Sequence, residues 1–175
     1  MENKNVITEI FEEILDNKSS KIMHDYLCND KKIKIYHKIG KFLSEVDSRN
    51  YNDVLKEVSK RLIYTFGCDV EYGAVSLHCM KLLYERFPNV LKLPTFLSWE
   101  HYQYLMQLDS YSQIIYYLNL CILKDLSIDE LRNKINYGEY YKTSKYRRKK
   151  IINNYKIVKF DVIDYLTKKI QRTYN

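Results

Sequence analysis

Aromatic, hydroxyl and basic side chains alternate along one short stretch near the C-terminal end of this sequence. Lysine and arginine can neutralise phosphates, while the ring of a tyrosine can stack on an exposed nucleobase. The stretch therefore predicts contact with the phosphates of a nucleic acid, either DNA or RNA. Contact with an acidic protein and simple solvation are alternatives, because basic helices serve those purposes too. The residues expected to make the contact are Lys142, Lys145, Tyr146, Arg147, Arg148, Lys149 and Lys150.

The charge of the chain is concentrated around this stretch. Residues 142–175 contain 11 Lys and Arg against two Asp, whereas residues 1–141 contain 18 Lys and Arg against 20 Asp and Glu. A polyanion would be attracted to the basic end rather than to the nearly neutral remainder. We therefore expect a helical domain over residues 1–141 and a basic C-terminal extension over residues 142–175.

The remaining reactive side chains do not indicate a second site. The four cysteines and four histidines have no metal-ligand spacing, so we expect no metal and no cofactor. Ser98 precedes an apolar helical stripe and is expected to cap a helix, because nothing in the sequence places a base beside it. Trp99 and Cys79 belong to apolar stripes and are expected in the core, and His101 is expected to make a structural hydrogen bond.

Helices must position these residues, since helical periodicity dominates the sequence. The clearest stripe runs from Tyr51 to Phe66, with apolar residues three and four positions apart, and Gly67 follows where helices often end. Ser127 and Glu130 have the spacing of a capping box. Only four Gly and two Pro occur, which argues against a turn-rich β-sandwich. We predict an all-α fold of about 7–8 helices.

The pattern becomes less regular beyond Gly138. Apolar spacing between Phe160 and Ile170 predicts a last helix in the basic extension, and a short strand over residues 157–160 is the alternative. No N-terminal signal peptide and no run of about 18 apolar residues is present. Together with cysteines that suit a reducing compartment, these observations favour the cytoplasm and no membrane partner.

Five sequence elements occur in order over residues 33–136. They are Ile39-Gly40-Lys41-Phe42-Leu43-Ser44, then Leu55 to Gly67 with Lys60, then Met80-Lys81-Leu82-Leu83-Tyr84-Glu85-Arg86-Phe87-Pro88, then Leu97-Ser98-Trp99-Glu100-His101-Tyr102, and finally Tyr116-Tyr117-Leu118 with Leu126-Ser127-Ile128-Asp129-Glu130-Leu131 and Ile135. Together they resemble the N-terminal helical domain of bacterial YhcG-like proteins, whose C-terminal half is a PD-(D/E)XK nuclease. The chain departs from that family where an arginine usually precedes the F-Y-L element, because it has Gln113-Ile114-Ile115 there.

The resemblance implies a DNA-associated accessory domain with a helix-turn-helix-like pair of helices, which would occupy residues 51–87. We add Lys81 and Arg86 to the candidate nucleic-acid contacts on this basis, and a merely solvated polar face is the alternative. The second helix of the pair would present Ser76, His78, Lys81, Glu85 and Arg86 to a partner.

The catalytic residues of the family lie in its nuclease half, and we expect this chain to lack that half. Asp/Glu-x-Lys triplets occur at Glu2–Lys4, Asp16–Lys18 and Asp30–Lys32. A Mg²⁺-dependent nuclease needs such a triplet on a strand, whereas each of these lies in or beside an amphipathic helix. We therefore assign no catalytic residue and expect that the protein is not an enzyme.

Two functions fit these expectations. The first is a non-catalytic nucleic-acid-binding protein. The second is a counter-defence protein of a phage or mobile element, of the anti-CRISPR type, which would bind and inhibit a host nuclease effector or block its guide and target channel. Either would act in the cytoplasm of a bacterial or phage-infected cell, and the sequence leaves the oligomeric state open.

Overall fold

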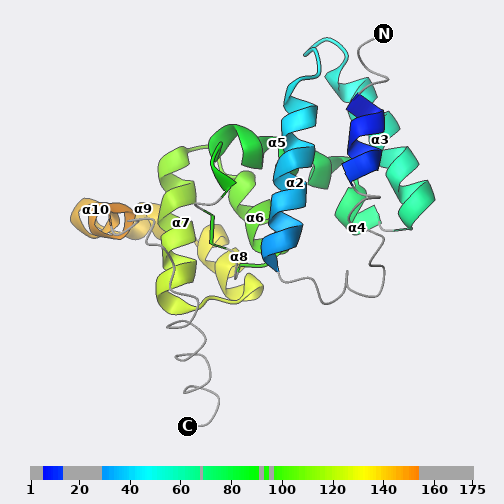
Figure 1. Cartoon of the computed structure of the whole chain (residues 1–175). Coiled ribbons are helices and arrows are strands. Elements are labelled where there is room, and N and C mark those ends of the chain that lie inside the picture. Colours follow the sequence, from blue (N-terminus) through cyan, green and yellow to red (C-terminus); the bar gives the residue numbers. More distant parts are fainter. Residues whose placement is uncertain (1–5, 14–28, 68, 91–92, 95–96, 154–175) are drawn as a thin grey trace, which may run out of the picture. The chain divides into compact units, whose positions relative to one another are not determined.

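The structure of this protein is a computed structural model that describes residues 6–13, 29–67, 69–90, 93–94 and 97–153 (Figure 1). All regular secondary structure in these ranges is helical, so the predicted all-α fold is confirmed. Residues 6–13 are helical, and the helices that follow are α2 (Asn29–Ser44), α3 (Tyr51–Phe66), α4 (Asp69–Tyr72), α5 (Ala74–Arg86), α6 (Trp99–Met106), α7 (Tyr111–Lys124), α8 (Ile128–Asn136), α9 (Glu139–Lys142) and α10 (Lys145–Asn153).

The chain divides into two compact units. Unit 1 comprises Met1–Leu91 and Thr95–Tyr111, and unit 2 comprises Lys92–Pro94 and Ser112–Asn175. The boundary expected between residues 141 and 142 follows the distribution of charge. It falls within unit 2 and stays a prediction.

Helix α5 is the centre of unit 1. It packs against α2, α3, α4 and α6, and its buried residues include Leu77, Met80 and Leu83. Helix α2 lies close to it at Gly40, where an added Cβ atom would collide with the carbonyl oxygen of Met80. Any side chain at this position would collide with backbone, so the close packing of α2 on α5 depends on glycine.

Helix α3 confirms the clearest periodic stripe of the sequence. It spans Tyr51–Phe66, and Gly67 ends it in the left-handed conformation, with φ 71° and its N–H donating to the Ile63 carbonyl oxygen at 2.7 Å. Helices α3 and α5 occupy the residues of the expected helix-turn-helix-like pair, with α4 between them. Because α5 also packs against α2 and α6, little of its surface is free to enter a groove.

The tryptophan joins three helices of unit 1. Trp99 begins α6, is 8% exposed, and packs on Tyr36 of α2 with ring centroids 4.8 Å apart. Its Nε1 donates a 3.0 Å hydrogen bond to Ser76 Oγ on α5. The expected core position of Trp99 is confirmed. The expectation that Ser76 faces a partner is wrong, because its hydroxyl is the buried acceptor that the indole N–H needs.

Helix α7 has the most buried residues of the described helices in unit 2, and its residues 113–121 are all buried. The capping box predicted at the start of α8 is confirmed. Ser127 Oγ accepts from the Glu130 N–H at 3.3 Å, and Glu130 Oε2 accepts from the Ser127 N–H at 2.8 Å. Gly138 then adopts the left-handed conformation, with φ 69°, immediately before α9 and α10.

Residues 154–175 lie outside the described ranges, so the last helix between Phe160 and Ile170 and its strand alternative stay predictions. Within the residues that the structure does describe, no helix is both long and apolar enough to span a bilayer.

Candidate nucleic-acid interface

Residues Lys142 to Lys150, called the basic segment below, extend from the last residue of α9 into α10. The segment contains six Lys and Arg residues and no Asp or Glu. Thr143 interrupts the helical path with φ −76° and ψ 134°. Ser144 directly precedes α10 and caps its first turn, since its Oγ accepts a 3.4 Å hydrogen bond from the N–H of Arg147. Most of the cations are therefore carried by a regular helix.

Buried polar side chains of α7 hold the basic segment in place. The hydroxyl oxygens of Tyr116 and Thr143 lie 2.9 Å apart. The Asn119 amide donates a 2.8 Å hydrogen bond to the carbonyl oxygen of Ile151 and a 3.4 Å one to that of Ile152. Tyr116 is 1% and Asn119 is 3% exposed. These contacts tie the residue pair before α10 and the C-terminal part of α10 to the buried side of α7.

Two further residues of α7 anchor the residues around α9. The hydroxyl of Tyr117 donates to the Lys134 carbonyl oxygen at 3.2 Å and accepts from the Tyr140 N–H at 3.1 Å. Burial raises the pKa of Tyr117, so the phenol stays neutral and keeps the proton that it donates. Gln113 Nε2 donates to the hydroxyl of Tyr141.

The sequence analysis named Gln113, Tyr116 and Tyr117 in the family elements but did not predict that they anchor another helix. Their signal was present as polar residues inside an otherwise apolar stretch, with Gln113 and Asn119 on either side of Ile114 to Leu118. Buried polar side chains need hydrogen-bond partners, so such residues predict a contact with another element. They do not predict which element it is.

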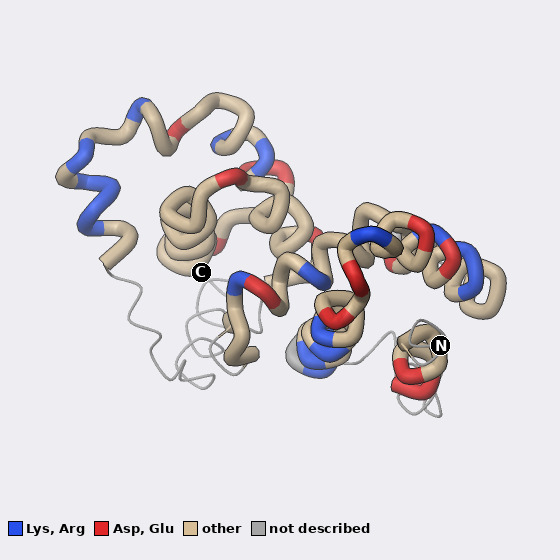
Figure 2. Tube along the Cα trace, turned by 90° about the horizontal axis from the view of Figure 1, so that it is seen from above, with Lys and Arg blue, Asp and Glu red and all other residues tan. Residues whose placement is uncertain are grey.

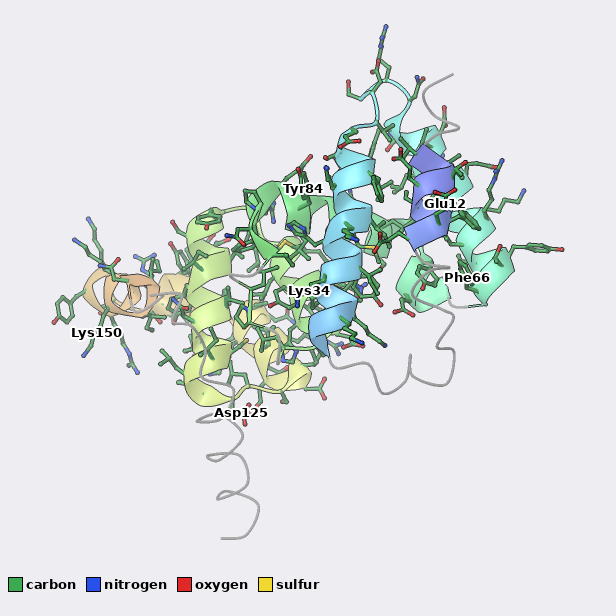
Figure 3. All side chains as sticks on the ribbon, in the orientation of Figure 1. Glu12, Lys34, Phe66, Tyr84, Asp125 and Lys150 are labelled. Carbon is green, nitrogen blue, oxygen red and sulfur yellow. The ribbon has the colours of Figure 1, made fainter. Side chains whose placement is uncertain are left out.

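Helix α10 has two different faces. Arg148, Ile151 and Ile152 are partly buried and lie on one side of the helix, as their spacing of three and four residues requires. Tyr146, Lys149 and Lys150 are exposed on the opposite side, and Tyr146 is 82% exposed. Figure 3 shows Lys150 on this helix, among long side chains that extend away from it.

No carboxylate neutralises the basic segment within the described ranges. None of its six cations forms an ion pair with an acidic side chain there. The nearest acid in sequence, Glu139, is instead paired with Lys134 at 2.7 Å. Figure 2 shows the resulting run of Lys and Arg along α9 and α10. The segment therefore presents an uncompensated positive field.

Two cations of this region lie against aromatic rings. The Lys142 Nζ is 3.2 Å from the ring centroid of Tyr137, and the Arg148 guanidinium carbon is 4.8 Å from that of Tyr140. Such cation–π contacts orient a side chain without cancelling its charge. Both contacts therefore leave the positive charge in place.

Lys81 and Arg86, the candidates on α5, have partners within unit 1. The Lys81 Nζ is 3.8 Å from Glu85 Oε1 and 3.8 Å from the ring centroid of Tyr51. The Arg86 Nη1 donates a 2.7 Å hydrogen bond to the carbonyl oxygen of Met106, the last residue of α6. Their role as nucleic-acid contacts stays a prediction, and the structure gives each of them an internal role.

A polar contact between α3 and α5 lies beside Lys81. The hydroxyl of Tyr51 is 2.9 Å from Nδ1 of His78. Burial raises the pKa of Tyr51 to about 12. Burial, and then the charge of Lys81, lower the pKa of His78. Near neutral pH the phenol therefore donates to a neutral imidazole, which is a stabilising contact rather than a reactive pair.

Ser98 and His101 lie closer together than the sequence indicated. Ser98 occupies the cap position of α6, but its Oγ is 3.0 Å from Nδ1 of His101. The expectation that nothing places a base beside Ser98 is wrong, because positions i and i+3 are neighbours in the first turn of a helix. His101 is 8% exposed, and its expected structural hydrogen bond is confirmed.

The two described cysteines are buried thiols. Burial raises the pKa of Cys79 to about 11 and that of Cys121 to about 12. Both thiols are therefore protonated and unreactive at neutral pH. The expected core position of Cys79 is confirmed, with 1% of its surface exposed.

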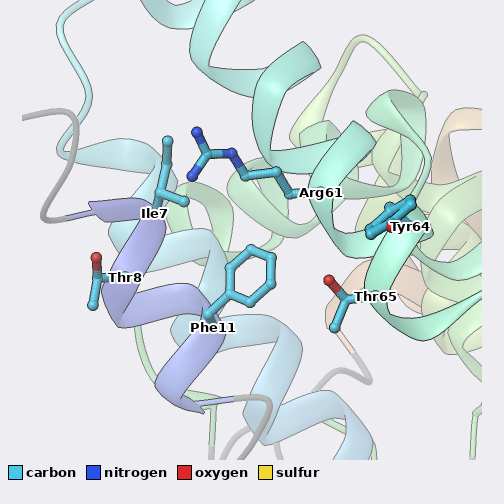
Figure 4. Close-up of a pocket in the computed structure, with 6 residues that line it drawn as sticks. All are labelled: Ile7, Thr8, Phe11, Arg61, Tyr64 and Thr65. Carbon is cyan, nitrogen blue, oxygen red and sulfur yellow. The ribbon is translucent and has the colours of Figure 1, made fainter.

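A shallow groove of about 290 Å³ lies between residues 6–13 and α3 in unit 1 (Figure 4). Arg61, the charged residue of its lining, is already paired with Glu57. Its lining residues are Ile7, Thr8, Phe11, Arg61, Tyr64 and Thr65. The groove thus offers no acid–base pair. In the described ranges, no three His, Cys, Asp or Glu side chains form a group that could hold a metal ion.

In the described ranges, the fold and the site define an all-α protein with a basic helix that has no acidic partner there. The chain belongs to the DUF1016 N-terminal domain family, whose model matches residues 10–142, and this is the N-terminal domain of YhcG-like nuclease family proteins. The resemblance inferred from the sequence is confirmed. Comparisons with curated proteins and with solved structures give no match. Because the family match ends at Lys142, the other five cations of the basic segment lie beyond it.

Proposed function

We propose that this protein is a non-catalytic nucleic-acid-binding protein of the bacterial cytoplasm, which contacts phosphates through its basic segment. The observation that carries the proposal is the set of six cations on this short segment, without an acidic partner among the described residues. Binding of such cations to a polyanion releases condensed counterions, which is the main source of sequence-independent affinity.

The anchoring by α7 supports the same proposal. A hydrogen bond between the hydroxyls of Tyr116 and Thr143, and one from Asn119 to the carbonyl oxygen of Ile151 just after the segment, hold the basic segment before any ligand arrives. A preorganised helix loses less conformational entropy on binding than a flexible basic tail does. Membership of a nuclease-related family is compatible with this function. No observation on the described residues favours the nuclease-inhibitor alternative, which stays a prediction.

The test is nucleic-acid binding as a function of salt. We expect a DNA duplex of about 30 base pairs and an RNA of the same length to bind, with affinity that falls steeply between about 50 and 200 mM salt. Replacement of Arg147, Arg148, Lys149 and Lys150 together by alanine should lower the affinity by at least about 100-fold and flatten the salt dependence.

A matched control removes four exposed cations of unit 1 instead. Lys31, Lys41, Lys56 and Lys60 are exposed on α2 and α3, so their replacement by alanine changes the net charge equally. We expect the control to retain most of the binding. Absence of binding by the wild-type protein at about 50 mM salt, or equal losses in the two variants, would contradict the proposal.

A further inference from the structure

Exposed tyrosines lie among the cations of unit 2. Tyr137, Tyr141 and Tyr146 are 68%, 72% and 82% exposed. The hydroxyl of Tyr141 accepts from Gln113, and Lys142 covers the ring of Tyr137. In the part of the chain that the structure describes, the ring of Tyr146 contacts no other ring or cation and its hydroxyl has no hydrogen-bond partner. Tyr146 therefore presents both faces of its ring to solvent.

The position of Tyr146 on α10 joins this ring to the cations. Lys149 and Lys150 follow it by three and four residues, so the three side chains share the exposed side of the helix. The opposite side of α10 is held by Asn119 of α7. A ligand that reaches this surface meets a flat aromatic ring with two ammonium groups beside it.

A ring and two cations in this arrangement distinguish between two forms of nucleic acid. In a duplex the faces of the bases are covered by their neighbours, so an exposed tyrosine gains little there and the cations supply the affinity. In a single strand the faces are accessible, and stacking on an aromatic side chain adds to the contribution of the cations.

We propose that the basic segment binds single-stranded nucleic acid, with an unpaired base stacked on the ring of Tyr146 and flanking phosphates on Lys149 and Lys150. This inference rests on the proposed function and narrows it to a class of ligand. The chemistry it uses, a base face and a phosphodiester, is shared by DNA and RNA.

The experiment compares three fluorescein-labelled probes at one salt concentration with the full chain. The probes are an oligo(dT) and an oligo(U) of about 20 nucleotides, and a DNA duplex of about 20 base pairs. Since a duplex has the higher charge density, charge alone would favour it. We expect the better of the two single strands to bind at least about tenfold more tightly than the duplex. The ratio of the affinities for oligo(dT) and oligo(U) then identifies whether the preferred single strand is DNA or RNA.

Substitutions of one exposed tyrosine separate stacking from charge. Tyr146→Ala should weaken binding to the single strand about tenfold and binding to the duplex less than about twofold, whereas Tyr146→Phe should retain the wild-type affinity. Tyr64→Ala is the matched control, since Tyr64 is 92% exposed on α3 in unit 1. We expect it to have no effect on either ligand.

The outcomes distinguish the two proposals. A duplex bound as tightly as the single strands, or equal losses for both ligands in Tyr146→Ala, would overturn the single-strand inference and leave the proposed function intact. A wild-type protein that binds none of the three probes would overturn both. A 2-aminopurine base in the single strand gives a second readout. Its fluorescence should be quenched on binding to the wild type and to Tyr146→Phe, but not on binding to Tyr146→Ala at saturating protein.

Discussion

Helix α5 in unit 1 and helix α10 in unit 2 carry all but one of the cations that the sequence singles out, and the two helices differ in what surrounds them. On α5, Arg86 is bonded to the carbonyl oxygen of Met106 and Lys81 lies between Glu85 and Tyr51. On α10, the cations have no acidic partner among the described residues. The comparison teaches that the packing of a helix, rather than its number of basic residues, decides whether its charges are available.

The largest effect should come from the packing that makes α5 a core helix. Gly40→Ala places a methyl group against the backbone of Met80, and overpacking of this kind should lower the free energy of unfolding by about 3 kcal/mol or more. Urea unfolding followed by circular dichroism measures it. Lys41→Ala, an exposed neighbour on α2, should cost less than about 0.5 kcal/mol. A Gly40→Ala variant as stable as the Lys41→Ala variant would contradict the conclusion that the packing of α2 on α5 depends on glycine.

A pair of arginine substitutions tests the comparison directly. Arg86→Ala removes a charged hydrogen bond to a partly buried carbonyl and should lower the free energy of unfolding by about 2 kcal/mol, with a smaller effect on nucleic-acid affinity than Arg147→Ala. Arg147→Ala should leave stability within about 0.5 kcal/mol of wild type. It should reduce the affinity about fivefold at low salt. Calorimetric melting and the salt titration provide the two measurements. Equal effects of the two substitutions on stability and on affinity would show that the cations of the two helices do not differ in this respect.

The anchor of α10 should have a smaller effect. Asn119→Ala leaves the carbonyl oxygens of Ile151 and Ile152 without their donor and should cost about 1 kcal/mol. The loss should appear as faster hydrogen exchange in α10 and in a weaker complex with nucleic acid. Asn133→Ala, at an exposed position on α8, is the control and should change neither. Unchanged exchange in Asn119→Ala would mean that α10 does not depend on this contact.

The smallest effect is a dependence of stability on pH that is confined to unit 1. Burial lowers the pKa of His37 and of His78 in the folded state. Below a pH of about 6.5 the unfolded chain therefore binds more protons than the folded one, and stability falls as the pH decreases. Urea midpoints at about pH 7.5 and 5.5 should differ in the wild type and differ less in a His37→Gln, His78→Gln variant. The basic segment contains no histidine or carboxylate, so binding of nucleic acid should not change over the same range.

The parts of the fold that depend on neighbouring residues could be predicted from the sequence. The stripe from Tyr51 to Phe66, the stop at Gly67 and the capping box of Ser127 and Glu130 all form through contacts within about one helical turn. The core position of Trp99 follows from its apolar stripe. The basic segment could also be predicted, because the positions of Lys and Arg are read directly from the sequence.

Contacts between distant residues could not be predicted in the same way. Ser76 and Trp99 are 23 positions apart, and no local pattern marks the serine as the acceptor of the indole N–H. The approach of Gly40 to Met80 likewise depends on how two helices cross. Lys81 and Arg86 are of the same residue types as the cations of α10. Only the packing of the helices around α5 gives them partners within unit 1.

The hydrogen bonds from α7 have a consequence for how the protein is made. Lys145 and Lys149 are one turn apart on α10, and like charges at this spacing oppose the formation of an isolated helix. During translation, the ribosome releases α7 before it releases α10. The hydroxyl of Tyr116 and the amide of Asn119 can therefore be in place when the repelling residues emerge. Helix α7 can therefore provide hydrogen-bond partners for α10, a helix whose own positive charges repel one another.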